Sequence, residues 1–116
     1  MHNEMWKQIP GYEGLYEAGD LGQIRRVPGT HSHARHGESG SRFWPGRILK
    51  PRPAGLGYLA VNLSKEGIVK SIKVHKLVLL AFQGKCEERL QANHKNGNKH
   101  DNRLENLERI TGTENI

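Results

Sequence analysis

The longest uninterrupted apolar run in this 116-residue chain is Leu77–Phe82, which is only six residues long. Apolar residues make up 34% of the sequence and aromatic residues 6%, so the chain can bury one small core. Its 14 glycines and 5 prolines favour turns. The sequence therefore predicts a loop-rich domain, or one domain with a small appendage, around a short buried segment.

The cysteine count and the termini bear on the compartment. Cys86 is the only cysteine, which excludes an intrachain disulfide and a cysteine-based zinc site. A single cysteine fits a reducing compartment. The apolar run is far shorter than a membrane span, and residues 1–6 do not resemble a signal peptide. We therefore expect a cytoplasmic protein with no membrane partner.

The positive charge is concentrated in the middle of the chain. The formal net charge is +6, and the pI is near 9.7. Residues 25–76 hold eleven Lys or Arg and two acids, a net charge of +9, whereas residues 1–24 sum to −3 and residues 77–116 to zero. Such a block favours a polyanion, with nucleic acid first and an anionic membrane second. A basic face that only keeps the protein soluble is the alternative.

Short strand-like segments predict two pairs of strands. Residues 15–18 and 23–27 form the first pair, joined by a glycine-containing turn. Residues 58–63 and 68–74 form the second, with the turn at residues 64–67. A helix is then expected over His75–Phe82, ended by Gly84, with Leu77, Leu80 and Ala81 on one face.

Residues 28–46 are dense in Gly, Ser, Arg and His, and we expect a loop there. His31, His33 and His36 suggest a metal site, but no second ligand cluster accompanies them. We favour a mobile loop over a metal site.

The C-terminal segment is polar. We expect strands at 90–94 and 108–111, a loop at 95–102 and one helical turn at 103–107. Thr111 and Glu114 have the spacing of a capping box, which predicts a helix from Gly112.

This segment also carries the residues suited to chemistry. His94 lies twelve residues before Asn106 and twenty-one before Asn115. Hydrolysis of a phosphodiester needs a base for the attacking water and a cation beside the phosphate. Histidine has a pKa suited to such a base, and asparagine oxygens are hard ligands suited to Mg²⁺ or Mn²⁺.

Three ordered motifs resemble the HNH nucleases, in the phage and intron homing-endonuclease branch. The first is the stretch from Asn93 to Leu107 followed by Asn115. The second is the helix Val74–Phe82, which looks like the helix that precedes the HNH motif. The third is Trp6–Arg25, which looks like a small modular motif found ahead of such nuclease domains.

The resemblance implies roles at matching positions. His94 would be the general base, Asn93 and Asn115 would bind one divalent cation (Mg²⁺ or Mn²⁺), and Asn106 would brace the loop by hydrogen bonds. Asn93 stands where the family has Asp or Asn. The other asparagines of the loop, including Asn102, fit turn and cap positions instead.

The resemblance implies an α+β fold with a small antiparallel β-hairpin region followed by a ββα-metal finger. We divide the chain into an N-terminal nuclease-associated motif (1–27), a basic, His-rich loop (28–46), and a hairpin, helix and HNH motif (47–116). The implied function is metal-dependent cleavage of double-stranded DNA, by nicking or by a homodimer that cuts both strands. The alternative is a DNA-binding module that has lost catalysis. The expected DNA contacts are Arg25, Arg26, Arg47, Lys70, Lys73, Lys95 and Lys99.

Overall fold

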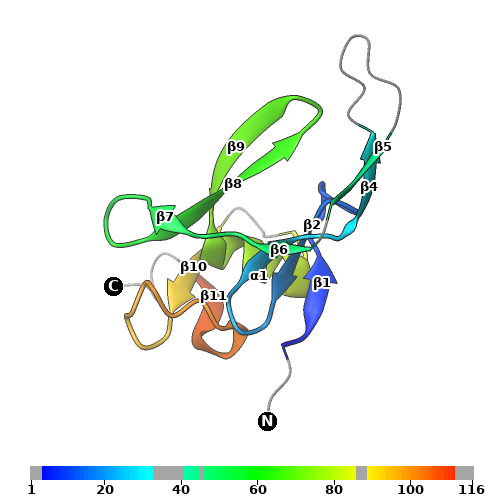
Figure 1. The fold of residues 1–116 in the computed structure, drawn as a ribbon. Coiled ribbons are helices and arrows are strands. Elements are labelled where there is room, and N and C mark those ends of the chain that lie inside the picture. Colours follow the sequence, from blue (N-terminus) through cyan, green and yellow to red (C-terminus); the bar gives the residue numbers. More distant parts are fainter. Residues whose placement is uncertain (1–3, 33–40, 45, 86–88, 112–116) are drawn as a thin grey trace.

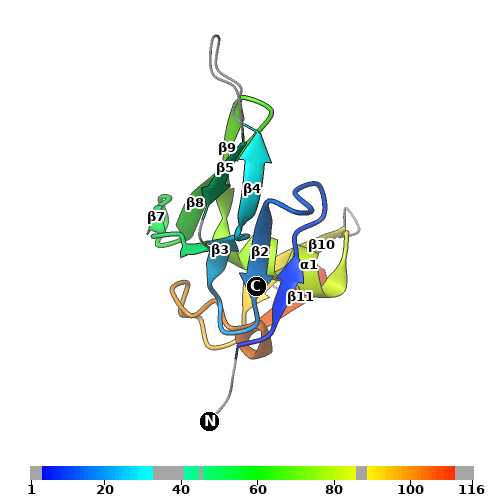
Figure 2. The ribbon, with the colours of Figure 1, turned by 45° about the vertical axis from the view of Figure 1, so that its right-hand side comes forward.

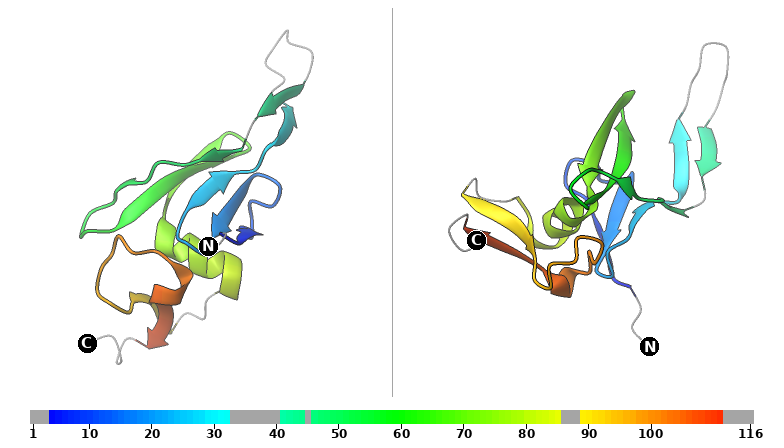
Figure 3. Two further views of the ribbon diagram at one scale, coloured as in Figure 1. Left: turned by 60° about the horizontal axis from the view of Figure 1, so that its bottom comes forward. Right: turned by 90° about the vertical axis from the view of Figure 1, so that its left-hand side faces the viewer.

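The computed structural model describes residues 4–32, 41–44, 46–85 and 89–111. Within these residues the fold contains one α-helix, α1 (Val74–Gln83). The helix contacts antiparallel sheets on one side and a C-terminal hairpin on the other (Figure 3). Among the described residues, no helix is long and apolar enough to cross a membrane. The α+β class expected from the sequence is confirmed.

The N-terminal residues form a four-stranded antiparallel sheet in the order β1-β2-β3-β6 (Figure 1). Its strands are β1 (Trp6–Gln8), β2 (Tyr16–Gly19), β3 (Ile24–Arg26) and β6 (Arg47–Ile48). Strands β2 and β3 match the first predicted pair within a residue or two at each end. The strand β6 pairs with β3, so the N-terminal motif and the segment that follows residue 46 share one sheet.

The segment between β3 and β6 departs from the predicted loop. Strands β4 (Gly29–Ser32) and β5 (Ser41–Trp44) pair as an antiparallel hairpin that projects from the rest of the fold (Figure 2). The loop prediction for residues 28–46 was therefore wrong for these eight residues. Thr30, Phe43 and Trp44 favour strands, but the surrounding Gly, Ser and His masked that signal. His33 and His36 lie outside the described residues, and the metal interpretation stays untested.

The second predicted hairpin is confirmed as part of a three-stranded sheet. It consists of β7 (Arg52–Pro53), β8 (Leu59–Lys65) and β9 (Ile68–Lys73). The turn is tighter than predicted, because Lys65 pairs with Ile68 and only Glu66 and Gly67 lie between the strands. Both turn residues have positive φ, 52° and 78°, as a two-residue type I′ turn requires.

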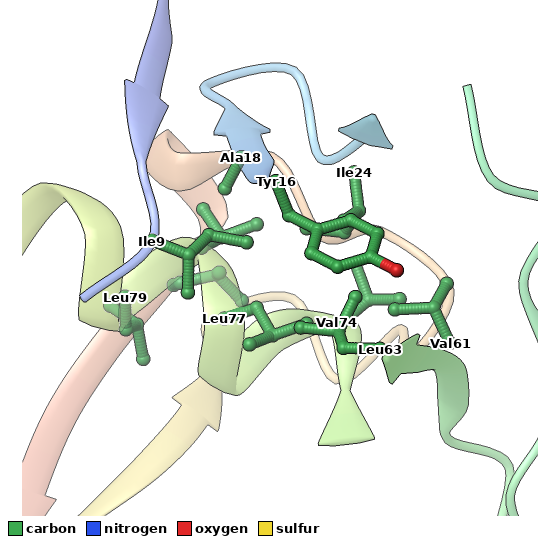
Figure 4. Close-up of a cluster of buried hydrophobic side chains, with 11 residues drawn as sticks. Ile9, Tyr16, Ala18, Ile24, Val61, Leu63, Val74, Leu77 and Leu79 are labelled. Carbon is green, nitrogen blue, oxygen red and sulfur yellow. The ribbon is translucent and has the colours of Figure 1, made fainter. Parts of the chain in front are cut away.

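The core lies between α1 and the strands above it (Figure 4). Tyr16, Ala18 and Ile24 of the N-terminal sheet pack in the same cluster as Leu77 of the helix. The predicted helix and its end at Gly84, where φ is 78°, are confirmed. The predicted buried face was only partly right: Val78 and Leu79 are buried, while Leu80 and Ala81 are half-buried. A helix enclosed from two sides buries more than one face.

The C-terminal hairpin confirms the remaining strands. Strand β10 (Leu90–His94) pairs antiparallel with β11 (Leu107–Thr111), and the 3₁₀ turn η1 (Leu104–Asn106) comes immediately before β11. The helix predicted from Gly112 lies outside the described residues.

Candidate active site

His94 is the last residue of β10, where the strand passes into the 95–102 loop. Its side chain is 6% exposed, and its Nε2 lies 2.8 Å from Oδ1 of Asn102, which is 5% exposed. An amide oxygen only accepts hydrogen bonds, so Nε2 of His94 is the donor in this pair. The lone pair then resides on Nδ1, where a general base needs it. The loop therefore fixes both the orientation and the tautomer of the imidazole.

A second imidazole lies against the first. The ring of His75, at the start of α1, is 4.8 Å from that of His94, centroid to centroid. Its other neighbour is Tyr58, stacked at 5.1 Å with an interplanar angle of 25°. Burial, with smaller contributions from His94, Lys76 and Lys73, lowers the pKa of His75 to about 4. His75 is therefore neutral at pH 7.

Asn93 precedes His94 and is paired across the hairpin with Glu108. Its Nδ2 donates to Oε2 of Glu108 at 2.8 Å, and this directs the amide nitrogen to the carboxylate. The amide oxygen is left available as a ligand. Asn93 and His94 both line a cavity of about 160 Å³, which Tyr58 and Lys99 also border.

Asn106 ties the two ends of the loop together from a buried position. Its Oδ1 accepts from the backbone N of Asn96 at 3.1 Å, and its Nδ2 donates to Oδ1 of Asn96 at 3.0 Å and to the carbonyl of Asp101 at 2.9 Å. The backbone N of Lys95 also donates to the Asn106 carbonyl at 2.7 Å. These bonds are of the kind expected for a residue that braces the loop.

Two of the predicted DNA-contacting lysines meet beside the histidines. The Nζ atoms of Lys73 and Lys99 lie 4.6 and 4.5 Å from the centroid of the Tyr58 ring. Lys99 also donates to the carbonyl of Leu56 at 2.6 Å. Lys95 is exposed on the same loop. The cavity that His94 lines is thus bordered by positive charge.

The other predicted contacts lie on the sheets. Arg47 and Lys70 are exposed on β6 and β9. Arg26 is half-buried and, with Arg47, lines a groove of about 620 Å³ between the N-terminal and three-stranded sheets. Arg25 differs from these, because its guanidinium donates two bonds to Glu17, at 2.7 and 2.9 Å, and lies 4.1 Å from the Trp6 ring.

The predicted metal ligands are only partly described. Asn115 lies outside the described residues, and the described ones contain no cluster of three or more His, Cys, Asp or Glu side chains able to hold a metal. What they do offer is the free amide oxygen of Asn93 beside the Glu108 carboxylate. Hard oxygen donors and a nearby negative charge suit Mg²⁺ or Mn²⁺. The residues present therefore fit part of a hard-cation site.

Glu108 and Asn102 are among the residues of this site that sequence reasoning missed. Glu108 was recoverable, because pairing the predicted strands 90–94 and 108–111 from their outer ends places it opposite Asn93. Asn102 was not, because it is one of several asparagines in a polar loop and nothing local distinguishes it.

The arrangement defines a histidine-centred site on a β-hairpin, and comparisons with known proteins agree with it. Residues 4–64 match the family model of the NUMOD4 motif, and residues 73–115 match that of an HNH endonuclease. DNA endonuclease I-HmuI of Bacillus phage SP01 is 32% identical over 111 residues, covering 96% of this chain and 55% of that protein. An uncharacterized HNH endonuclease of Acanthamoeba polyphaga mimivirus is 33% identical over 119 residues, covering 98% of this chain and 25% of that protein.

A solved structure matches as well. It describes DNA binding and cleavage by the HNH homing endonuclease I-HmuI, with a TM-score of 0.73 and 33% identity over 96% of this chain and 55% of the other. The chain thus spans about half the length of I-HmuI and a quarter of the mimivirus protein. It belongs to the HNH homing endonucleases that carry a NUMOD4 motif, which confirms the resemblance seen in the sequence.

Proposed function

We propose that this chain is a divalent-metal-dependent endodeoxyribonuclease that hydrolyses phosphodiester bonds in double-stranded DNA. The observation that carries the proposal is the buried His94, whose Nε2 is bonded to Asn102 while the residue lines a cavity together with Asn93 and Lys99. Membership of the HNH homing endonucleases supports the same activity.

His94 acts as the general base. Its Nδ1 takes a proton from the attacking water, and the bond from Nε2 to Asn102 stabilises the ring as it becomes charged. Neutral His75, 4.8 Å away, adds no positive charge against that imidazolium. The proton therefore moves to a ring that is already oriented.

Asn93 and Asn115 would hold the cation through their amide oxygens, with Glu108 orienting Asn93 from across the hairpin. The chemistry that such a cation would supply is neutralisation of charge on the phosphate and on the leaving 3′ oxygen. Asn106 keeps the loop in shape. Lys95 and Lys99 contact phosphate near the cut, while Arg26, Arg47, Lys70 and Lys73 extend the contact along the backbone. A monomer acting with the His94 site alone would nick, and cutting both strands would need a second copy.

The test is incubation of the protein with supercoiled plasmid, with and without Mg²⁺ or Mn²⁺. We expect nicking that needs the ion and that falls by about a hundredfold or more in His94→Ala, the usual scale for a general base. DNA binding without metal should barely change in that variant. DNA binding with no cleavage in either Mg²⁺ or Mn²⁺ would instead identify a DNA-binding module that has lost catalysis.

A further inference from the structure

The residue that orients His94 is itself held by the N-terminal motif. Asn102 begins the passage from the loop into η1, and the turn between β2 and β3 lies directly against its backbone. A Cβ built on Gly22 would lie 2.7 Å from the carbonyl carbon of Asn102, 2.8 Å from its oxygen and 3.0 Å from the backbone N of Arg103. Real Cβ atoms do not approach backbone this closely. Gly22, at φ +94°, is therefore required for the contact as well as for the turn.

A hydrogen bond fixes the register of the same contact. The backbone N of Leu104 donates to the carbonyl of Asp20 at 2.8 Å, two residues from Asn102 on one side and two from Gly22 on the other. The 3₁₀ turn that follows Asn102 is thus attached to the β2–β3 turn. Neither contact involves a side chain that would reach DNA.

The β2–β3 turn has its own support. The Oε2 of Glu4 accepts from the backbone N of Leu21 at 3.2 Å and from that of Gln23 at 3.4 Å. The Asp20 carboxylate accepts from the backbone N of Met5 at 2.8 Å, and the backbone N of Asp20 donates to the Met5 carbonyl at 3.0 Å. Glu4 is partly buried, and this burial raises its pKa above the ordinary value. The turn against Asn102 is therefore bonded to Glu4 and Met5 as well as to Leu104.

We propose that the N-terminal motif positions the catalytic base: the β2–β3 turn, through Gly22, holds Asn102, and Asn102 fixes the orientation and tautomer of His94. Gly22 and Asn102 are positioning residues in this scheme, since they act only through His94. The inference rests on the proposed function, in which His94 is the base. It adds a role for the NUMOD4 region that does not depend on contact with DNA.

The test compares variants that differ in one respect each. Asn102→Leu is nearly isosteric and removes the acceptor, whereas Asn102→Asp keeps an acceptor oxygen. Gly22→Ala places a methyl against Asn102. Gly14→Ala is the matched control, because Gly14 lies in the same motif with φ +78° and has no atom within 4 Å of a built Cβ. Backbone strain is similar in the two alanine variants, and only Gly22→Ala meets the active-site loop.

Three readouts are measured: the maximal nicking rate at saturating ion and DNA, the dissociation constant for DNA without metal, and the His94 tautomer from ring ¹⁵N shifts at a pH where the histidines are neutral. In Asn102→Leu and Gly22→Ala we expect a rate at least about tenfold lower, as ångström-scale misplacement of catalytic groups produces. The dissociation constant should stay the same, and His94 should show a mixture of tautomers. Asn102→Asp should keep the wild-type Nε2–H tautomer, and Gly14→Ala should keep both that tautomer and a rate within a few-fold of wild type.

If Gly22→Ala does not fold, Glu4→Ala replaces it, because it loosens the turn without adding an atom near Asn102. A wild-type tautomer and rate in Asn102→Leu, or in whichever of Gly22→Ala and Glu4→Ala is used, would overturn the inference. His94→Ala separates this failure from failure of the proposed function. An unchanged nicking rate in His94→Ala would contradict the proposed function, because His94 would not be the base. A rate that is lost in His94→Ala but kept in Gly22→Ala and Asn102→Leu would contradict only the positioning role of the N-terminal motif.

Discussion

The imidazole rings of His75 and His94 lie 4.8 Å apart, although the two residues are nineteen positions apart in the sequence. His75 comes from the first turn of α1 and His94 from the end of β10, so the pair joins the helix to the hairpin. Tyr58 stacks on His75 as well. Burial of His75 lowers its pKa, with smaller contributions from His94, Lys76 and Lys73.

This burial predicts an acid limb in the stability of the protein. The folded pKa of His75, about 4, lies below the unfolded value of about 6.5. The unfolded state therefore binds the proton first, and stability is lost as the pH falls from about 6.5 towards 4. His75→Phe keeps a ring against Tyr58 and should flatten this part of the curve. Urea unfolding at pH 7, 6, 5 and 4.5 measures it, and parallel curves for the two proteins would contradict the prediction.

The pairing of Asn93 with Glu108 gives opposite predictions with and without metal. Asn93→Asp adds a charge beside the cation, worth about 1–2 kcal/mol at an effective dielectric near 20, so the Mg²⁺ midpoint for nicking should fall about tenfold. Without metal the new carboxylate faces Glu108, and the melting temperature should drop. Added Mg²⁺ should restore it.

Glu108→Gln and Asn115→Ala should instead raise the Mg²⁺ midpoint. The glutamine variant keeps an acceptor for the Asn93 amide and removes only the charge. Nicking rates against ion concentration measure all of these effects. One shared midpoint for the four proteins would show that neither asparagine binds the metal.

Asn106→Ala should destabilise the protein and slow cleavage together. The substitution leaves the backbone N of Asn96 and the carbonyl of Asp101 without their side-chain partner, at a cost of about 2 kcal/mol. Asn98→Ala is the control, because Asn98 is an exposed residue of the same loop that bonds within its own turn. Thermal melts and nicking rates should separate the two variants, and equal effects would contradict a bracing role for Asn106.

The salt dependence of DNA binding should distinguish Arg47 and Lys70, which are exposed, from Arg25, which is bonded to Glu17. Affinity for duplex DNA is expected to fall steeply with salt, and Arg47→Ala with Lys70→Ala should lower the log–log slope by about 0.9 per lost phosphate contact. Arg25→Ala should leave the slope nearly unchanged and lower the melting temperature, because Arg25 is bonded to Glu17 and packed on Trp6. Binding measured between low and physiological salt provides the slopes. A slope that changes only in Arg25→Ala would reverse this assignment.

The helix and strands that could be predicted from the sequence are those with a local sequence signal. The apolar run ended by Gly84 predicted the helix, and alternation of side chains predicted the hairpin of β8 and β9. The residues that contact His94 and affect its orientation or charge could not be predicted in this way. Asn102 is selected by a backbone contact with Gly22, eighty residues earlier, and His75 is selected by the packing of α1. Such contacts depend on how sheets, helix and hairpin assemble, which no local pattern encodes.

The shared core has a consequence for how such nucleases diversify. Tyr16 and Ile24 come from the NUMOD4 match, Leu77 and Leu107 from the HNH match, and all four lie in one cluster of buried side chains. A recombination crossover between residues 65 and 72 would pair two half-cores from different parents. We expect such chimaeras to fold only when both halves fit in volume, so inheritance should favour transfer of the whole unit over exchange of its parts.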